Sequence, residues 1–201
     1  DWYTPYKKPR YNGGGNCVHW ISDIKLSPFD SDTALFNTGT GLFMITGLAI
    51  GDVLVKPFCE GIEETVHLNV YTTPHGRNRI IDIIGDLGGF AFKDYDSECE
   101  NSFANEKGDR YITCLNADLT LSDPEYIVAT PRGNWTGKTK GGLILSKDCG
   151  STWERLPMPR GLSEFIDQKL DNIEKPNVDS GWTAISADGK RIMWAVAGGR
   201  G

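Results

Sequence analysis

The feature that most constrains the fold is a short turn motif, SKDCGSTW at positions 146–153, which directly follows the apolar run 142–145. An aspartate carboxylate can accept backbone N–H bonds and so stand in for a turn of backbone. The glycine can take a positive φ without steric cost, the serine and threonine hydroxyls can bond back across a hairpin, and the tryptophan can pack beneath it. The motif therefore predicts a tight hairpin between two strands, with these structural residues: Ser146, Asp148, Gly150, Thr152 and Trp153.

Short apolar segments with two-residue alternation recur along the whole chain and are separated by turns rich in Pro, Asp and Gly. The composition, with 24 Gly, six Trp, seven Tyr and eight Phe, also favours many short strands joined by tight turns. We therefore expect an all-β protein. The predicted strands are 21–26, 34–37, 41–45, 65–72, 80–84, 89–93, 112–116, 126–130, 142–145, 183–186 and 191–195.

These strands fall into four groups, and the turn 187–189 in the last group echoes the motif at 146–153. Small β-meanders that recur along a chain are typical of propeller blades. At about 40 to 50 residues per blade, 201 residues supply about four blades, and the last stops after its second strand. We therefore expect an incomplete propeller over 16–201, which another domain or chain completes.

Two further segments do not fit the blade pattern. Residues 1–15 predict an N-terminal extension or an inter-domain linker. The segment 163–173, SEFIDQKLDNI, gathers its apolar residues roughly on one helical face and predicts a helical insertion between blades.

Charge, hydropathy and cysteine spacing narrow the range of partners. A net charge of −6 argues against nucleic acid, because phosphate binding requires clustered Lys and Arg. The chain has no apolar run long enough for a membrane span and no apolar signal core at its N-terminus. Its five cysteines form no CxxC pair, so we expect neither a metal nor a cofactor, although Cys99 and Cys114 could close a local loop in an oxidising compartment. The tripeptide 134–136 is either a glycan acceptor or an ordinary loop.

The pattern SxDxGxTW resembles the Asp-box, or BNR repeat, which lies between the third and fourth strands of propeller blades in sialidases, xyloglucanases and sortilin-type receptors. A sialidase needs three converging arginines, and the arginines here are scattered. In order and spacing, five blocks resemble glycoside hydrolase family 74: 19–43 with HWISDI, 61–74 with GIEET, 83–96 with GDLGGF, the Asp-box, and 182–199. The match corresponds to the start of the second propeller in that family.

The resemblance implies a fold and an activity. Members of this family are secreted xyloglucanases and related β-1,4-glucanases, built of two seven-bladed propellers that face each other across a cleft. The resemblance thus implies part of an incomplete seven-bladed propeller, an extracellular location, and a polysaccharide partner such as xyloglucan or another β-glucan. No cofactor is implied.

The resemblance also implies a catalytic residue. Family members hydrolyse the glucan with inversion, using one aspartate from each propeller as general acid and general base. In the block HWISDI that residue is Asp23, the candidate general acid. We expect Trp20, Ile21 and Ile24 to desolvate its carboxyl and raise its pKa, and the alternative is a solvent-facing residue of a first strand. The partner aspartate lies in a block of type TDxGGAYRW, which this chain lacks, so the chain carries at most half of the pair.

Substrate binding by a glucanase requires aromatic platforms, on which pyranose rings stack. Trp20 is the first candidate and Tyr71 the next. His19 could hold a sugar hydroxyl or be structural, and Asp86 could contact substrate or anchor its turn. Two functions therefore remain open, namely part of a family-74-like hydrolase, and a non-catalytic Asp-box propeller that binds glycan or builds an extracellular assembly.

Overall fold

The computed structural model describes residues 20–39, 41–58, 65–99, 101–133, 139–157 and 181–196. The chain divides into two compact units, 1–64 and 65–201, and each is described by itself. The described residues form strands and turns only, which confirms the all-β prediction. His19, the predicted extension 1–15, the tripeptide 134–136 and the predicted helical insertion 163–173 lie outside them.

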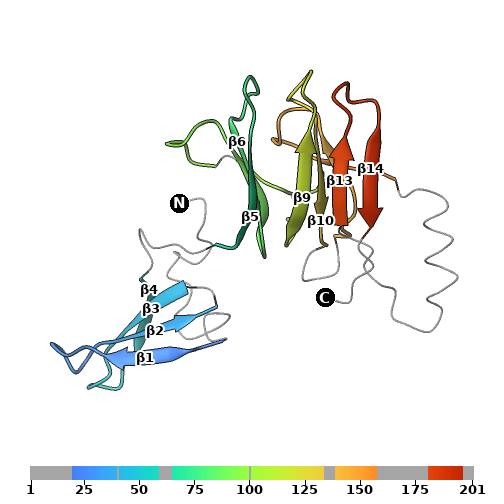
Figure 1. Ribbon diagram of the computed structural model, residues 1–201. Coiled ribbons are helices and arrows are strands. Elements are labelled where there is room, and N and C mark those ends of the chain that lie inside the picture. The colour runs from blue at the N-terminus through green and yellow to red at the C-terminus, as the bar shows by residue number, and fades with distance from the viewer. Residues whose placement is uncertain are drawn as a thin grey trace, which may run out of the picture. The chain divides into compact units, whose positions relative to one another are not determined.

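The first unit is a four-stranded antiparallel sheet with the strands in chain order (Figure 1). The rings of Phe36 and Phe43 stack at 5.4 Å and form its small core, against which Ile45 and Val55 pack. The strands are β1 (Asp23–Leu26), β2 (Ala34–Thr38), β3 (Gly41–Thr46) and β4 (Leu54–Pro57). The three predicted strands are confirmed, whereas β4 was not predicted.

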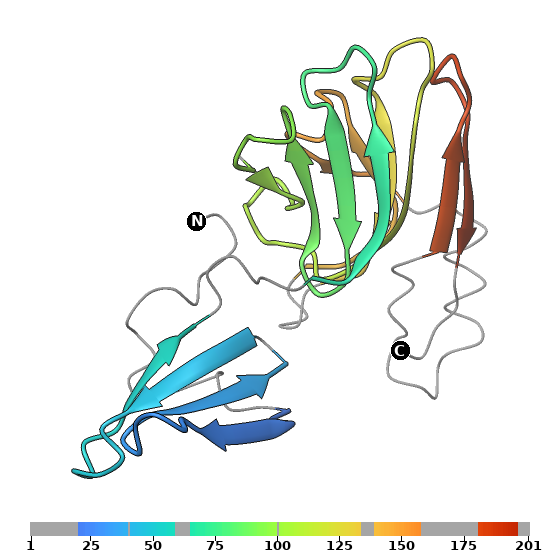
Figure 2. The ribbon, with the colours of Figure 1, turned by 60° about the vertical axis from the view of Figure 1, so that its left-hand side comes forward.

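The second unit contains two four-stranded antiparallel sheets and a two-stranded ribbon, which stand side by side (Figures 1 and 2). Each sheet keeps its strands in chain order, as a propeller blade does. The first sheet has β5 (His67–Thr72), β6 (Ile80–Ile84), β7 (Gly88–Phe92) and β8 (Asn101–Ser102); the second has β9 (Cys114–Leu119), β10 (Ile127–Pro131), β11 (Ile144–Ser146) and β12 (Glu154–Arg155); the ribbon has β13 (Gly181–Ile185) and β14 (Ile192–Val196).

Apolar side chains fill the space between the two complete sheets. Ile81 and Ile83 of β6 are fully buried there, and the rings of Phe103 and Trp153 lie 4.4 Å apart at a tilt of 48°. Full burial of an aliphatic side chain of this size contributes about 1.5–3 kcal/mol. A second cluster, around Val128 and Ile185, joins the second sheet to the ribbon. The three sheets are therefore held together mainly by hydrophobic packing.

Polar links also run from the first strand of each sheet to the first strand of the next. The Tyr71 hydroxyl on β5 accepts a hydrogen bond from the backbone N–H of Ala117 on β9 at 3.3 Å. On β9, the Asn116 and Asp118 side chains accept the N–H groups of Thr183 and Ile185 on β13, at 2.7 and 2.8 Å. In this unit, side chains on the first strand of one sheet thus accept backbone N–H groups on the edge strand of the next sheet.

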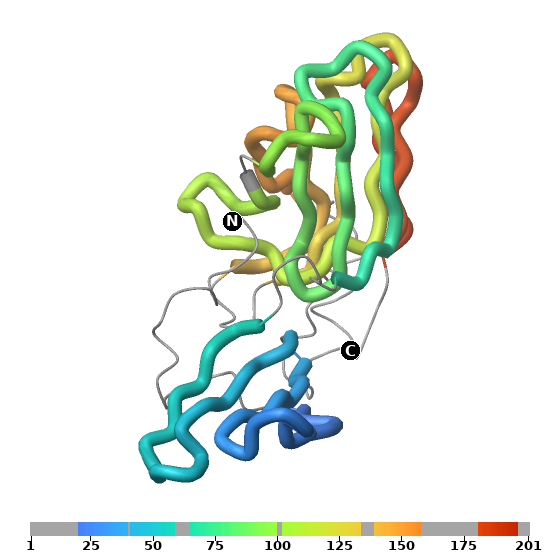
Figure 3. Tube along the Cα trace, turned by 90° about the vertical axis from the view of Figure 1, so that its left-hand side faces the viewer, coloured from blue at the N-terminus to red at the C-terminus, as the bar shows by residue number. Residues whose placement is uncertain are grey.

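The loops 73–79, 120–126 and 186–191 lie together at one end of the second unit (Figure 3). The backbone N–H of Arg77 donates to the Glu125 carboxylate at 3.0 Å, and the N–H of Ser122 donates to the carbonyl of Ala187 at 3.1 Å. The β11–β12 turn joins the same end, because the N–H of Cys149 donates to the Glu125 carbonyl at 2.9 Å. Cys114 and Cys149 are buried free thiols, so no Cys99–Cys114 bridge forms.

Candidate functional site

The Asp148 carboxylate is occupied by its own hairpin between β11 and β12. Its Oδ1 accepts the Ser146 hydroxyl and the Thr152 N–H, both at 2.8 Å, and its Oδ2 accepts the Thr152 hydroxyl at 2.6 Å. Burial raises the pKa of this carboxyl, but the hydrogen bonds from Thr152 and Ser146 outweigh burial and hold the pKa below its ordinary value. These contacts fit a structural role.

The rest of the same hairpin is tightly packed. Gly150 has a φ of +83°, and a Cβ at this position would lie 2.9 Å from the Cδ1 atom of Ile81. Trp153 is buried, and its indole N–H donates to the Gly150 carbonyl at 3.2 Å. The turn therefore requires a glycine both for its backbone conformation and for the approach of the neighbouring sheet.

Asp23 opens β1, and its side chain is 58% exposed. Its Oδ1 accepts the Lys25 ammonium at 3.0 Å and the N–H of Ile24 at 2.8 Å, and these hydrogen bonds lower the pKa of the carboxyl. The expectation that Trp20, Ile21 and Ile24 would desolvate Asp23 and raise its pKa is therefore wrong for this unit. All three side chains are exposed, because β1 is the edge strand of its sheet.

Trp20 lies just before β1 with 79% of its surface exposed and a φ of 54°. An exposed indole offers a flat apolar face on which a sugar ring can stack. It lies three positions from Asp23, so the first unit brings an acid and an aromatic platform to the beginning of one strand. His19 lies outside the described residues.

Asp86 occupies the turn between β6 and β7, with a φ of 63° and an exposed side chain. Its backbone N–H donates to the Thr113 hydroxyl at 3.0 Å, so the main chain fixes the turn. Within the described residues its carboxylate makes no hydrogen bond or ion pair, which leaves it open to a ligand. Asp86 lies at the end of its sheet where β5 begins, as Asp23 lies where β1 begins.

Tyr71 lies near the opposite end of β5 and is half-buried. Its hydroxyl accepts the N–H of Ala117 and the side-chain amide of Asn69, the latter at 3.1 Å. Burial raises the pKa of the Tyr71 phenol. The hydroxyl therefore links two sheets, and only the partly exposed ring remains available for stacking.

A hydroxyl, an imidazole and a carboxylate form a chain that the sequence motifs did not predict. His67 Nδ1 lies 2.8 Å from Asp82 Oδ2, and His67 Nε2 lies 2.6 Å from Thr65 Oγ1. Asp82 is buried on β6, and this burial raises the pKa of its carboxyl despite the His67 contact. The signal was an aspartate inside the apolar strand IIDII, together with a histidine near the beginning of the preceding predicted strand. Such a chain can pass a proton.

Two further observations bear on ligands and membranes. Among the residues that the structure describes, no group of three or more His, Cys, Asp or Glu side chains is arranged to hold a metal ion. No helix in the described ranges is both long and apolar enough to span a bilayer.

No family model matches the chain. In sequence, it is 24% identical over 183 residues to a xyloglucanase of Paenibacillus sp and 27% identical over 184 residues to an oligoxyloglucan-reducing end-specific xyloglucanase of Emericella nidulans. It is 26% identical over 200 residues to a xyloglucanase of Acetivibrio thermocellus. These alignments cover 88%, 89% and 96% of this chain, but only 16%, 21% and 21% of the relatives. The chain therefore spans about a fifth of the length of the relatives it matches.

The fold gives the same result. The chain superposes on the GH74 xyloglucanase of Xanthomonas campestris with a TM-score of 0.59 and 23% identity, over 88% of this chain and 23% of that one. The Niastella koreensis GH74 enzyme matches with a TM-score of 0.53 and 18% identity, over 89% and 22%. The resemblance to glycoside hydrolase family 74 predicted from the sequence motifs is therefore confirmed, in sequence over most of the chain and in fold.

Proposed function

We propose that the chain is part of a secreted enzyme that hydrolyses xyloglucan, or a related β-1,4-glucan, with inversion. The observation that carries the proposal is the placement of Asp23 and Trp20 at the exposed start of β1, in a chain similar to xyloglucanases over at least 88% of its length. In this proposal, Asp23 is the general acid. A second domain or chain, facing this one, supplies the general base.

Inversion requires two carboxyl groups about 6.5–9.5 Å apart, one protonating the leaving oxygen and the other activating water. In the free unit the ammonium of Lys25 stabilises the ionised form of Asp23, which opposes the acid role. Glucan bound over β1 would exclude water from this carboxyl and so favour its protonated form. Proton donation would therefore begin only once the substrate covers the site.

Substrate would be held by stacking on Trp20 and by hydrogen bonds from sugar hydroxyls to the open Asp86 carboxylate, each within its own unit. The indole supplies apolar contact to the C–H face of a pyranose, whereas the carboxylate accepts up to two hydroxyl donors. Trp20 and Asp86 should therefore contribute to affinity, whereas Asp23, as the general acid, should contribute to turnover.

The test measures binding and hydrolysis separately, on xyloglucan and on undecorated β-glucan. Retention in an affinity gel reports binding, and release of reducing ends reports turnover. Trp20→Ala should weaken retention by about fivefold or more, corresponding to about 1 kcal/mol of stacking. In the protein that also carries the general base, Asp23→Asn should leave retention unchanged and lower turnover by about 10²-fold or more. The matched control is Asp52→Asn, an exposed carboxylate without a hydrogen bond among the described residues.

One observation favours the second candidate function, a non-catalytic propeller that binds glycan or builds an extracellular assembly. Asp23 is exposed and its pKa is lowered, as in an ordinary surface carboxylate. Retention on xyloglucan without any release of reducing ends, in the protein that carries both facing domains, would favour this candidate. Absence of retention on either glucan would contradict the hydrolase proposal, and so would turnover that Asp23→Asn leaves intact.

A further inference from the structure

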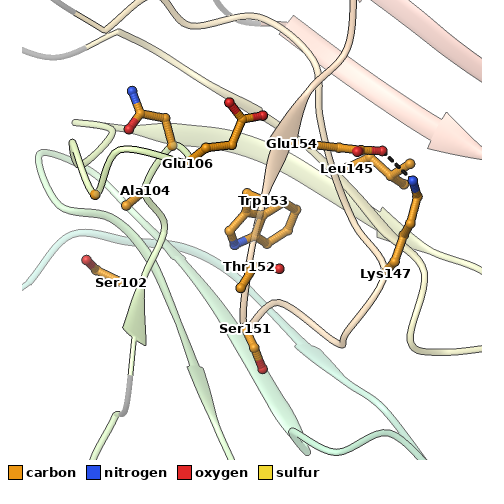
Figure 4. Close-up of a pocket in the computed structure, with 11 residues that line it drawn as sticks. Ser102, Ala104, Glu106, Leu145, Lys147, Ser151, Thr152, Trp153 and Glu154 are labelled. Carbon is orange, nitrogen blue, oxygen red and sulfur yellow. Dashed lines mark ion pairs between the residues drawn. The ribbon is translucent and has the colours of Figure 1, made fainter.

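An open hollow of about 570 Å³ lies in the second unit, between the turn that follows β8 and the β11–β12 hairpin. None of the candidate catalytic or substrate-binding residues lines it. Trp153 lies in the middle of the lining side chains, with Glu106 on one side and the Lys147–Glu154 pair on the other (Figure 4). Hollows of a few hundred Å³ suit small ligands.

The turn on one side of the hollow is fixed by its own hydrogen bonds. The side-chain carbonyl of Asn105 accepts the backbone N–H groups of Lys107 and Asp109, both at 2.9 Å. The N–H of Gly108 donates to the Asn105 carbonyl at 2.9 Å. Glu106 is therefore presented from a closed turn.

The opposite wall and the floor are fixed as well. Asp148 holds both the N–H and the hydroxyl of Thr152, and the Trp153 ring packs on Phe103. Since both walls are held before any ligand arrives, binding would require little ordering of the protein.

The polar groups of the hollow match hydroxyl groups. Glu106 is exposed, and its carboxylate makes no hydrogen bond or ion pair with the described residues. Glu154 Oε1 lies 2.6 Å from Lys147 Nζ, so an acceptor and a donor stand side by side. A sugar hydroxyl both donates and accepts, and can therefore bond to a carboxylate and an ammonium together. The partly exposed side chains of Ala104 and Leu145 add apolar surface for the C–H groups of a sugar, and the buried Trp153 ring supports them from below.

The same groups disfavour other ligands. Two carboxylates against one ammonium give the lining a surplus negative charge, which repels phosphate and other anions. Only Ala104, Leu145 and the buried Trp153 line the hollow with apolar side chains, so it offers little apolar surface to a lipid tail. A neutral molecule with many hydroxyl groups carries no negative charge to be repelled and needs no large apolar surface.

We propose that this hollow is a second carbohydrate site, which binds a short neutral oligosaccharide on the second unit, whereas Asp23 and Trp20 belong to the first. The choice of a glucan as the probe rests on the proposed function, whereas the site itself does not depend on catalysis. Such a site would hold a polysaccharide chain to the protein while another stretch of it occupies the reacting site.

The test is an NMR titration of the protein with a xyloglucan oligosaccharide and with a cello-oligosaccharide. The amide signals of Gly108 and Thr152 should shift on binding, because both residues line the hollow. Glu106→Ala combined with Lys147→Ala should weaken this binding by about tenfold, as expected for the loss of two polar contacts of about 0.7 kcal/mol each. Asp96→Ala, which removes another exposed carboxylate of the same unit, is the matched control.

Trp20→Ala separates this inference from the proposed function. If this variant keeps the shifts at Gly108 and Thr152 but no longer retains glucan at the first unit, the two sites are distinct, as proposed. Shifts that survive unchanged in the Glu106/Lys147 double variant would overturn the inference. Shifts produced by calcium and not by either sugar would overturn it too, since they would indicate a cation site.

Discussion

Replacing Asp118 with alanine should loosen the β13–β14 ribbon from the sheet before it. The Asp118 carboxylate on β9 accepts the backbone N–H of Ile185 at 2.8 Å, and Ile185 is only 9% exposed. In Asp118→Ala this N–H has no acceptor, and of the two side-chain links from β9 to β13 only that of Asn116 remains. The apolar cluster around Val128 and the Thr130 hydroxyl still hold the ribbon from β10.

A hydrogen bond to a charged group contributes about 1.5–3 kcal/mol, and an unsatisfied buried donor costs about 1–3 kcal/mol. Asp118 is itself partly exposed, so we expect a loss near the lower end of this range, about 2 kcal/mol. Asp118→Asn keeps an acceptor of the same shape and loses only the charge. It should therefore cost about 1 kcal/mol less than Asp118→Ala.

Amide hydrogen exchange followed by NMR measures this loss residue by residue. If the ribbon opens as a local unit, exchange at Ile185 should accelerate by about thirtyfold in Asp118→Ala, while the amides of β6 are unchanged. Equal protection of Ile185 in the wild type and in Asp118→Ala would refute the proposed link. Acceleration that is equal at β6 and at Ile185 would also refute it, because it would reflect global unfolding.

Three further predictions follow from buried groups. Trp153→Ala should lower the free energy of unfolding by about 3–5 kcal/mol, measured by urea denaturation, because it removes the ring packed on Phe103; a loss under about 1 kcal/mol would contradict this packing. Burial raises the pKa of Asp82 above 3.8, so the folded protein holds a proton that the unfolded chain releases, and stability should fall as pH rises from 3.8 through the folded pKa. Asp82→Asn should abolish that fall in pH-dependent unfolding curves, and an unchanged slope would argue against it. Burial raises the pKa of Cys114 to about 12, so iodoacetamide at neutral pH should modify this thiol only after unfolding, as read by peptide mass mapping; rapid modification of the native protein would disprove it.

Alternation predicted the long strands but missed the short ones. The prediction for 80–84 matches β6, in which four of the five residues are buried. The two-residue strands β8 and β12, by contrast, are defined by pairing with β7 and β11, which no local pattern reveals. The prediction 112–116 fell short of β9, which extends to Leu119, because Asn116 and Asp118 place polar side chains toward the ribbon.

The candidate site was predicted less completely than the fold. The predicted strand 21–26 included Asp23, and the structure begins β1 at that residue. Whether its carboxyl is desolvated depends on what covers the strand, and β1 is an exposed sheet edge. The Thr65–His67–Asp82 chain was missed because its members meet only through the pairing of β5 with β6. Contacts between side chains on paired strands cannot be predicted from the sequence of either strand alone.

The direction of the links between first strands has a consequence for recombination and engineering. Strand β9 supplies the side-chain acceptors, and β13 supplies the backbone N–H donors. A transplanted sheet would therefore have to bring acceptor side chains for the sheet that follows it in the chain. Its own N–H groups would also have to meet acceptors on the sheet before it, as the N–H of Ala117 meets the Tyr71 hydroxyl. Sheets of this kind are therefore not freely interchangeable parts. Any exchange of one sheet separates its first strand from the first strand of a neighbouring sheet, so a chimaera has to restore the acceptor–donor pairs at each junction.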